Sequence, residues 1–166
     1  MNINKDSLEG IRGLLILKIN NKEYCSDIKN VSVVLKLNDE NLNNYNPKES
    51  IFYYSNEKFK IIDIKELLGS RTVRIPPRSK IILFETFGSH FGFFADEILE
   101  IIIIDSLFVE YSIDFIPYSR DGFIRGQLVM DDREILFFDF EKFSKHLANL
   151  KKLSVSALPG KVLEGH

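Results

Sequence analysis

One pattern of strands and turns occurs twice in the chain, and this repeat limits its possible folds more than any other feature. Residues 121–143 read "DGFIRGQLVMDDREILFFDFEKF", which is two apolar stretches around a polar turn, followed by Asp139 and a charged segment. Residues 56–69, "NEKFKIIDIKELLG", have the same order around Asp63. A unit this small buries little apolar surface by itself, so we expect the two copies to share one core.

The rest of each half can be aligned in the same way. "YCSDI" at 24–28 parallels "FGFFA" at 91–95, and "FKIID" at 59–63 parallels "ILFFD" at 135–139. Each half therefore reads hairpin, strand, loop, hairpin and capped helical turn. Two small β-barrels packed on a shared core would accommodate this order, and closing a barrel removes most exposed strand edges.

Four apolar stretches end in pairs of residues that are typical of tight turns. The pairs are Asn20-Asn21, Ser55-Asn56, Gly88-Ser89 and Asp131-Asp132. Asn, Gly, Ser and Asp tolerate the positive φ that hairpin turns require. The sequence therefore predicts four hairpins and a mostly β, antiparallel protein.

Helical signals are fewer. Asp63 and Asp139 each stand where an N-cap is expected, and Gly69 is a stop signal for the first of these helices. The second is expected at 139–153, with one apolar stripe. The stripe consists of Phe140, Phe143, Leu147 and Leu150. The polar, Asn-rich stretch 38–50 is predicted to be a long exposed loop.

Charge and composition exclude several classes of protein. The net charge is −2, and the nearest approach to a basic cluster, "RTVRIPPR" at 71–78, is interrupted by proline. A duplex-binding surface needs a concentrated basic stripe, so we expect no nucleic-acid binding. The most apolar stretch, 98–109, is interrupted by Glu100 and Asp105 and is shorter than the roughly 20 residues of a membrane span. We expect a cytoplasmic protein without direct membrane insertion.

No arrangement of reactive residues indicates an enzyme. Cys25 is the single cysteine, and a small buried thiol is the favoured interpretation over a nucleophile. Asp63 and Asp139 could form a catalytic pair, but helix capping explains both. No histidine has a partner at metal-ligand spacing. The three are His90, His146 and His166. We therefore expect no catalytic residue, no metal and no cofactor.

Four segments carry a resemblance to a known family. They are "KINNKEYCSDIKNVSVV", "KFKIIDIKELLG", "KIILFETFGSHFGFFADEILEII" and "GFIRGQLVMDDREILFFDFEKF". In this order and spacing they resemble the CheW family of chemotaxis coupling proteins. The resemblance covers roughly 14–143, and the last two segments are the most specific.

The resemblance implies a fold and a role. The fold is mostly β: two pseudo-repeated five-stranded SH3-like β-barrels packed together, with short helices. It implies one domain over 1–166, with barrel halves at about 14–75 and 76–143 and a C-terminal helix at 139–153. The implied role is a non-enzymatic adaptor between the cytoplasmic tip of a chemoreceptor and the regulatory domain of a CheA-type histidine kinase. Such a protein is recruited to membrane-associated receptor arrays.

The sequence departs from the family at one turn. The family usually has Asn-Leu-Arg-Gly there, and the Arg is important for receptor coupling. This chain has Tyr53-Tyr54-Ser55-Asn56, without the planar guanidinium donors. One alternative is therefore a divergent module that binds the kinase but not standard receptors, or that serves another signalling pathway. A small β-barrel hydrolase or a nucleic-acid protein is a third hypothesis, for which the sequence offers no reactive pair or basic stripe.

The resemblance and the strand pattern together give candidate partner-binding residues. "VSVVLKL" at 31–37 places alternate residues on one face of a strand, which faces either the core or a partner. Exposed tyrosine is a common interface anchor, and Arg125 points either to solvent or to an acidic residue of a partner. The receptor-groove candidates are Val31, Val33, Tyr53, Tyr54, Ser55 and Asn56. The kinase-interface candidates are Leu35, Leu37 and Arg125.

Overall fold

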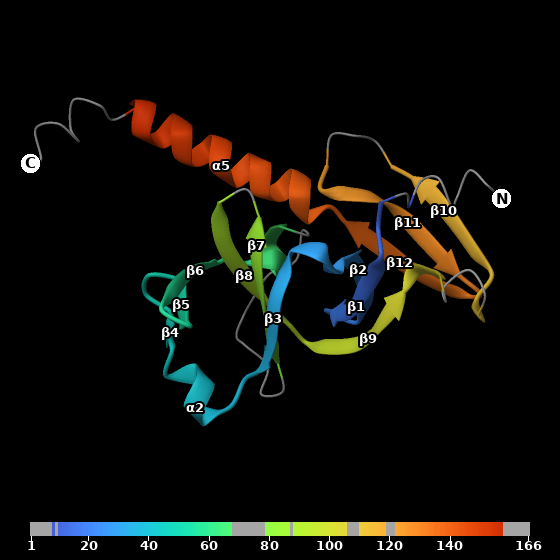
Figure 1. Cartoon of the computed structure of the whole chain (residues 1–166), viewed down its shortest axis with the longest axis horizontal. Coiled ribbons are helices and arrows are strands. Elements are labelled where there is room, and N and C mark those ends of the chain that lie inside the picture. Colours follow the sequence, from blue (N-terminus) through green and yellow to red (C-terminus); the bar gives the residue numbers. More distant parts are fainter. Residues whose placement is uncertain are drawn as a thin grey trace, which may run out of the picture.

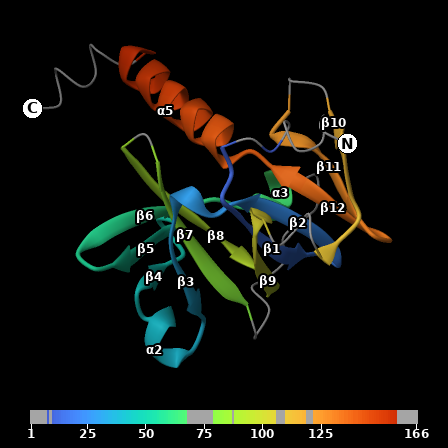
Figure 2. The same ribbon diagram turned by 45° about the vertical axis from the view of Figure 1, so that its right-hand side comes forward.

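Two curled β-sheets lie against each other and account for most of the fold (Figures 1 and 2). The computed structural model describes residues 8, 10–67, 79–86, 88–105, 110–118 and 122–157. The features predicted at Gly69, 71–78 and His166 lie outside these ranges. The prediction of a mostly β protein of two packed SH3-like units is confirmed, and the units are two curled sheets.

Each sheet has six strands, one more than the five expected. Sheet A has the order β10 (Ile113–Pro117), β11 (Ile124–Met130), β12 (Arg133–Phe138), β2 (Lys22–Asp27), β1 (Gly13–Ile19) and β9 (Glu97–Ile103). Sheet B has the order β3 (Val31–Lys36), β7 (Lys80–Thr86), β8 (Ser89–Ala95), β6 (Glu57–Ile61), β5 (Ile51–Tyr54) and β4 (Tyr45–Asn46).

Each sheet takes strands from both halves of the chain. Sheet A joins β1 and β2 of the first half to β9–β12 of the second, and sheet B joins β7 and β8 to β3–β6. The expected halves 14–75 and 76–143 therefore describe a repeat in the sequence. In the structure the halves exchange their first hairpins: β1–β2 joins the sheet of the second half, and β7–β8 joins the sheet of the first. The chain crosses from one sheet to the other after β2, through the 3-10 helix η1 (Ile28–Asn30), and again after β8.

The exchange depends on two parallel contacts, β2 with β12 and β8 with β6, which share one register. The pairs are Tyr24–Leu136 and Cys25–Phe137 in sheet A, and Phe91–Lys60 and Gly92–Ile61 in sheet B. The two registers are related by the same alignment that the repeat predicts. All other neighbouring strands pair antiparallel.

The four predicted hairpins are confirmed, and turn residues explain them. β1–β2, β5–β6, β7–β8 and β11–β12 are all antiparallel neighbours. The positive φ angles at their turns are 52° at Asn20, 64° at Asn21, 51° at Ser55, 64° at Asn56, 73° at Gly88 and 56° at Asp131. Such angles match the right-handed twist of the flanking strands in a tight hairpin.

Apolar side chains form three clusters: one within each sheet and one, the seam, between the sheets. β1 contributes side chains to two of them: Leu14 and Ile16 lie in the sheet A cluster, and Leu15 and Leu17 lie in the seam. β7 alternates in the same way between the sheet B cluster and the seam. A strand buried on both faces reads as a continuous apolar run, as "LLILKI" and "KIILF" do.

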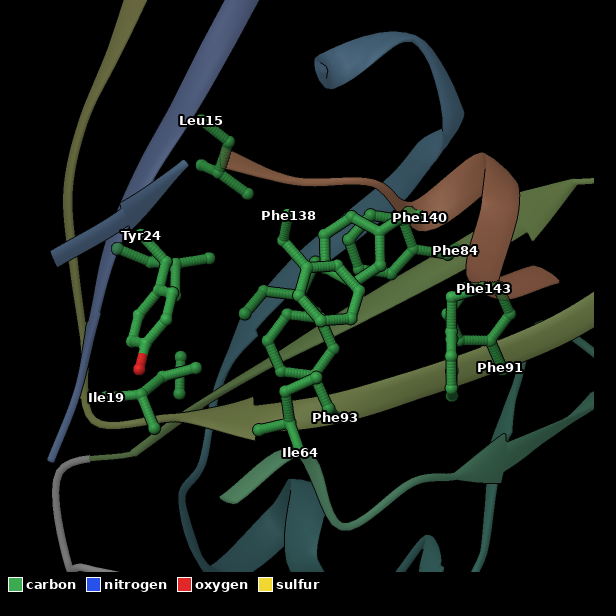
Figure 3. Close-up of a cluster of buried hydrophobic side chains, with 13 residues drawn as sticks. Leu15, Ile19, Tyr24, Ile64, Phe84, Phe91, Phe93, Phe138, Phe140 and Phe143 are labelled. Atoms are coloured by element: carbon green, nitrogen blue, oxygen red, sulfur yellow. The ribbon is translucent and has the colours of Figure 1, made fainter. Parts of the chain in front are cut away.

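Aromatic rings fill the seam (Figure 3). Phe84 of β7 lies 4.1 Å from Phe140 between ring centroids, and Phe138 lies 4.3 Å from the same ring. The buried members of the seam are Leu15, Leu17, Ile19, Tyr24, Ile64, Ile82, Phe84, Phe91, Phe93, Ala95, Phe138, Phe140 and Phe143. Both halves of the chain contribute, so the expected shared core is confirmed.

Two helices follow the last strands of the halves, α3 (Ile64–Leu67) and α5 (Phe140–Ala157). The Asp139 carboxylate accepts a hydrogen bond from the Lys142 amide at 2.9 Å, which confirms its role as the cap of α5. The Ser144 hydroxyl donates to the Thr86 carbonyl at 3.1 Å and fixes the helix on β7. α5 then projects past the β7–β8 hairpin and ends four residues after the expected position 153 (Figure 1).

The stretch 38–50 is more ordered than predicted. It contains a short helix, α2 (Asp39–Leu42), and the strand β4. Asparagine side chains explain this, since the Asn38 side chain accepts from the Asn41 amide at 2.8 Å and the Asn46 side chain accepts from the Lys48 amide at 3.1 Å.

Candidate partner-binding surfaces

The tip of the β5–β6 hairpin projects from sheet B with two partly exposed aromatic rings. Tyr53 and Tyr54 are 41% and 37% exposed, although neighbouring side chains of a strand point to opposite faces. The reason is that β4 is only two residues long and pairs with Ile51 and Phe52, so it does not cover the end of β5. The following turn at Ser55 is exposed and uncharged.

A bulge changes the faces of β3. Val31 pairs with Phe84 and Val33 with Leu83, so Ser32 is an extra residue in the ladder. Val31 consequently packs against the seam, while Val33 packs against the sheet B cluster. The prediction that both share one face is wrong, because one additional residue reverses the side-chain direction.

The later residues of β3 face inward. Leu35 is half-buried against the sheet B cluster, and Leu37 is 6% exposed within it. Leu37 therefore belongs to the core, and its place in a kinase interface stays a prediction. Leu35 keeps a partly accessible side chain.

Arg125 lies in the other sheet. It is exposed on β11, and its guanidinium carbon lies 5.3 Å from the centre of the Phe137 ring. A cation over an aromatic face is attracted to it, so this contact holds the side chain against sheet A. Arg125 and the β3 residues are thus on different sheets and do not form one patch.

The edges of sheet A expose large apolar side chains that the sequence did not single out. Ile101 and Ile103 on β9 are 60% and 54% exposed, while Ile102 between them is buried. On β10, Ile116 and Tyr118 beyond its end are about half exposed. β9 and β10 each have one strand neighbour, so these edges stay accessible although barrel closure was expected to remove most exposed edges. Strand alternation within "IIII" at 101–104 was the available signal.

A groove of about 470 Å³ lies between hairpin β5–β6, the β7–β8 turn and α5. It is lined by Ile51, Lys58, Lys60, Gly88, Ser89, His90, Phe91 and Leu147. His90 also approaches acidic side chains, with Nε2 3.7 Å from Glu57 and 3.5 Å from Glu85. Within the described parts of the chain, no three His, Cys, Asp or Glu side chains are placed to hold a metal ion.

Cys25 is buried in sheet A, and burial raises the pKa of its thiol. Only the thiolate is a nucleophile, so this cysteine is unsuited to covalent chemistry. Of the two aspartates considered as a pair, Asp139 caps α5, while Asp63 lies near Tyr45, whose phenol pKa is raised first by burial and then by this carboxylate.

Labelling with a thiol reagent tests the burial of Cys25. We expect the native protein to react at least about 100-fold more slowly than the urea-unfolded chain, because the thiol must first be exposed by opening of the sheet. Ellman's reagent at pH 8 measures both rates, and a single cysteine makes the stoichiometry unambiguous. Rapid labelling of the folded protein would contradict the placement of Cys25.

Two curled sheets with a shared apolar seam define a double SH3-like β protein. A family model described as "CheW-like domain" matches residues 13–148, and the chain belongs to this family.

A solved structure supports the fold. The chain is similar to the scaffolding protein TtCheW from Thermoanaerobacter tengcongensis, with a TM-score of 0.57 and 22% identity, over 77% of this chain and 88% of that chain. A comparison with curated proteins gave no match. Membership of a non-enzymatic scaffold family supports a scaffold or coupling role in chemotaxis. None of the described helices is long and apolar enough to cross a membrane.

Proposed function

We propose that this protein is a non-enzymatic adaptor that couples chemoreceptors to a CheA-type histidine kinase. The observation that carries the proposal is the match of residues 13–148 to the CheW-like domain, which spans both sheets and the seam. The partners are the regulatory domain of the kinase and the cytoplasmic tip of the receptor. The protein then acts in the cytoplasm, recruited to membrane-associated receptor arrays.

The distribution of exposed apolar groups supports an adaptor with two binding ends. Tyr53 and Tyr54 mark one end, in sheet B, and Ile101, Ile103 and Ile116 mark sheet A. The β4–β5 region and β10 lie at opposite ends of the molecule in both ribbon views (Figures 1 and 2). Aromatic and aliphatic anchors of this kind supply most of the binding energy in protein interfaces. Two separated ends allow one protein to hold two partners at once.

A pull-down with the regulatory domain of the cognate kinase tests the adaptor role. We expect the full chain to retain the kinase domain. One of two variants, Tyr53→Ala or Ile101→Ala, should weaken this retention while remaining folded, which identifies the end that binds the kinase. No retention by a correctly folded wild type would overturn the proposal. Retention that neither variant changes would instead locate the interface elsewhere.

The turn at Ser55 favours a second candidate: a divergent member that binds the kinase but not standard receptors, or that serves another signalling pathway. The turn carries no cation, and its neighbour Glu57 is directed at His90. A receptor carboxylate would find no planar donor pair there.

Replacing Ser55 with arginine is expected to increase co-sedimentation with receptor fragments by about tenfold, the effect of one charge-assisted hydrogen bond of roughly 1.4 kcal/mol. Ser55→Gln is the matched control, since it adds length and hydrogen-bonding capacity without charge. The assay is run with and without the kinase. Wild-type protein that already sediments as well as Ser55→Arg would eliminate the divergent candidate.

A further inference from the structure

Ion pairs join the strands at which the two halves are exchanged. Lys65 follows β6, Asp96 follows β8, and Lys65 Nζ lies 3.0 Å from Asp96 Oδ1 in sheet B. Their side chains are 10% and 25% exposed. In sheet A, Lys29 follows β2, Glu141 follows β12, and Lys29 Nζ lies 3.6 Å from Glu141 Oε2 on a more exposed surface.

These two pairs occupy equivalent positions with opposite polarity. The alignment of Tyr24 with Phe91 places Lys29 at the position of Asp96, five residues further on in both halves. Asp63 aligned with Asp139 likewise places Lys65 at the position of Glu141. The first half therefore carries two cations where the second half carries two anions.

A third pair of positions has the reverse polarity at the other end of the parallel strands, because the first half carries Glu23 and Glu57 where the second carries His90 and Arg133. Arg133 of β12 donates from Nε to Glu23 of β2 at 3.1 Å, and from Nη1 to Glu100 of β9 at 2.9 Å. Burial by itself would lower the pKa of Arg133, but the hydrogen bonds and charges of the two glutamates outweigh it and raise that pKa. The equivalent contact in sheet B is between Glu57 and His90, whose side chains are 3.7 Å apart. In sheet A the acidic residue is on β2, whereas in sheet B it is on β6, the equivalent of β12.

The apolar pattern alone permits another arrangement. β6 and β12 carry buried apolar residues at equivalent positions and pair in the same register, so β2 could pair with β6 and β8 with β12. Each half would then close its own sheet. In that sequential pairing Lys29 would meet Lys65, Asp96 would meet Glu141, and Glu23 would meet Glu57. Each contact would bring like charges together on, or directly after, adjacent strands, which is destabilising.

We propose that the reversed charges at these positions are a conformational device that selects the exchanged pairing of the two halves and excludes the sequential one. Opposite charges support β2–β12 and β6–β8, and like charges oppose β2–β6 and β8–β12. Lys65 and Asp96 contribute most, because their burial reduces screening by solvent. These charges act during folding, when the strands pair and before the apolar seam forms.

Swapping one exposed pair tests this without disturbing the native contact. Lys29→Glu combined with Glu141→Lys keeps opposite charges in sheet A. In the sequential pairing, however, the new acidic side chain at position 29 would meet Lys65 and the new basic one at position 141 would meet Asp96, so both contacts become attractive. The matched control is Lys29→Gln with Glu141→Gln, which removes the native pair and creates no new attraction.

The readout is refolding from urea, followed by stopped-flow fluorescence and by the yield of native protein. We expect the swapped variant to show a slow-refolding fraction about threefold to tenfold larger than that of the wild type, the effect expected when two facing pairs change from repulsive to attractive. The neutral control should lie between the two, because it loses the repulsion without gaining an attraction. Adding Lys65→Glu and Asp96→Lys to the swapped variant restores like charges in the sequential pairing and should remove most of the slow fraction. Equal refolding of the swapped and neutral variants, whether both succeed or both fail, would overturn the proposal.

Discussion

Replacing Phe84 with alanine is expected to lower the free energy of unfolding by about 3–5 kcal/mol, the largest effect of any single truncation in the seam. Phe84 is fully buried, and its ring lies 5.4 Å from Phe91, 5.5 Å from Phe93 and 4.1 Å from Phe140, measured between centroids. Sheet B and α5 both lose contacts in the seam when this ring is removed. Urea unfolding followed by circular dichroism measures the change.

Tyr53→Ala is the control for Phe84→Ala, because it removes a comparable ring from a side chain that is 41% exposed. Its expected cost is about 0.5 kcal/mol or less. A cost below about 1 kcal/mol for Phe84→Ala would mean that the sheets do not depend on a common seam.

The second large effect on stability is expected at Gly92, whose equivalent in the first half of the repeat is Cys25. A Cβ at Gly92 would lie 2.7 Å from the Ile82 carbonyl oxygen and 2.7 Å from Leu83 Cδ2. The carbonyl belongs to the neighbouring strand and cannot move without breaking the ladder. Gly92→Ala should therefore destabilise the protein by about 1–3 kcal/mol, in the range of overpacked cores, although alanine has the better strand propensity.

Gly122→Ala is the matched control for Gly92→Ala. Its added Cβ would have its nearest neighbour, the Ile124 amide nitrogen, at 3.9 Å, so we expect a change within about 0.5 kcal/mol. Thermal unfolding of both variants gives the comparison. Equal stability of the two variants would show that β8 does not approach β7 as closely as the structure has it.

Local signals made much of the fold predictable. The hairpin turns at Asn20-Asn21 and Ser55-Asn56 carry residues that tolerate positive φ, and Asp139 precedes an apolar stripe at helical spacing. Each of these depends on a few neighbouring residues, and the structure bears them out. The two parallel contacts were not predicted, since the sequence indicated antiparallel pairing, but the repeat alignment relates their registers.

The exchange of strands could not be predicted from the apolar pattern. Phe59 and Ile61 of β6 match Ile135 and Phe137 of β12 so closely that either strand is an acceptable neighbour for β2. In our proposal the charges distinguish the two arrangements, and this pattern can be recognised only when the strand order is known. Sequential halves were therefore the natural, but incomplete, interpretation.

The candidate binding residues were the least predictable part. The bulge at Ser32 has no sequence signal, since one extra residue in a β-branched run leaves its composition unchanged. It sends Val31 to the seam and Leu37 to the core of sheet B. The hairpin tip with Tyr53 and Tyr54 was found because its turn was recognised. The roles of these residues in receptor or kinase binding stay predictions.

The pairing of β2 is the central claim, because the seam, the two ends and the charge pattern all depend on it. Cross-strand nuclear Overhauser effects in the isotope-labelled full chain measure it directly. The structure predicts contacts from Cys25 to Phe137 and from Tyr24 to Leu136. Contacts from Cys25 to Ile61 in their place would show that each half closes its own sheet, and would contradict the account.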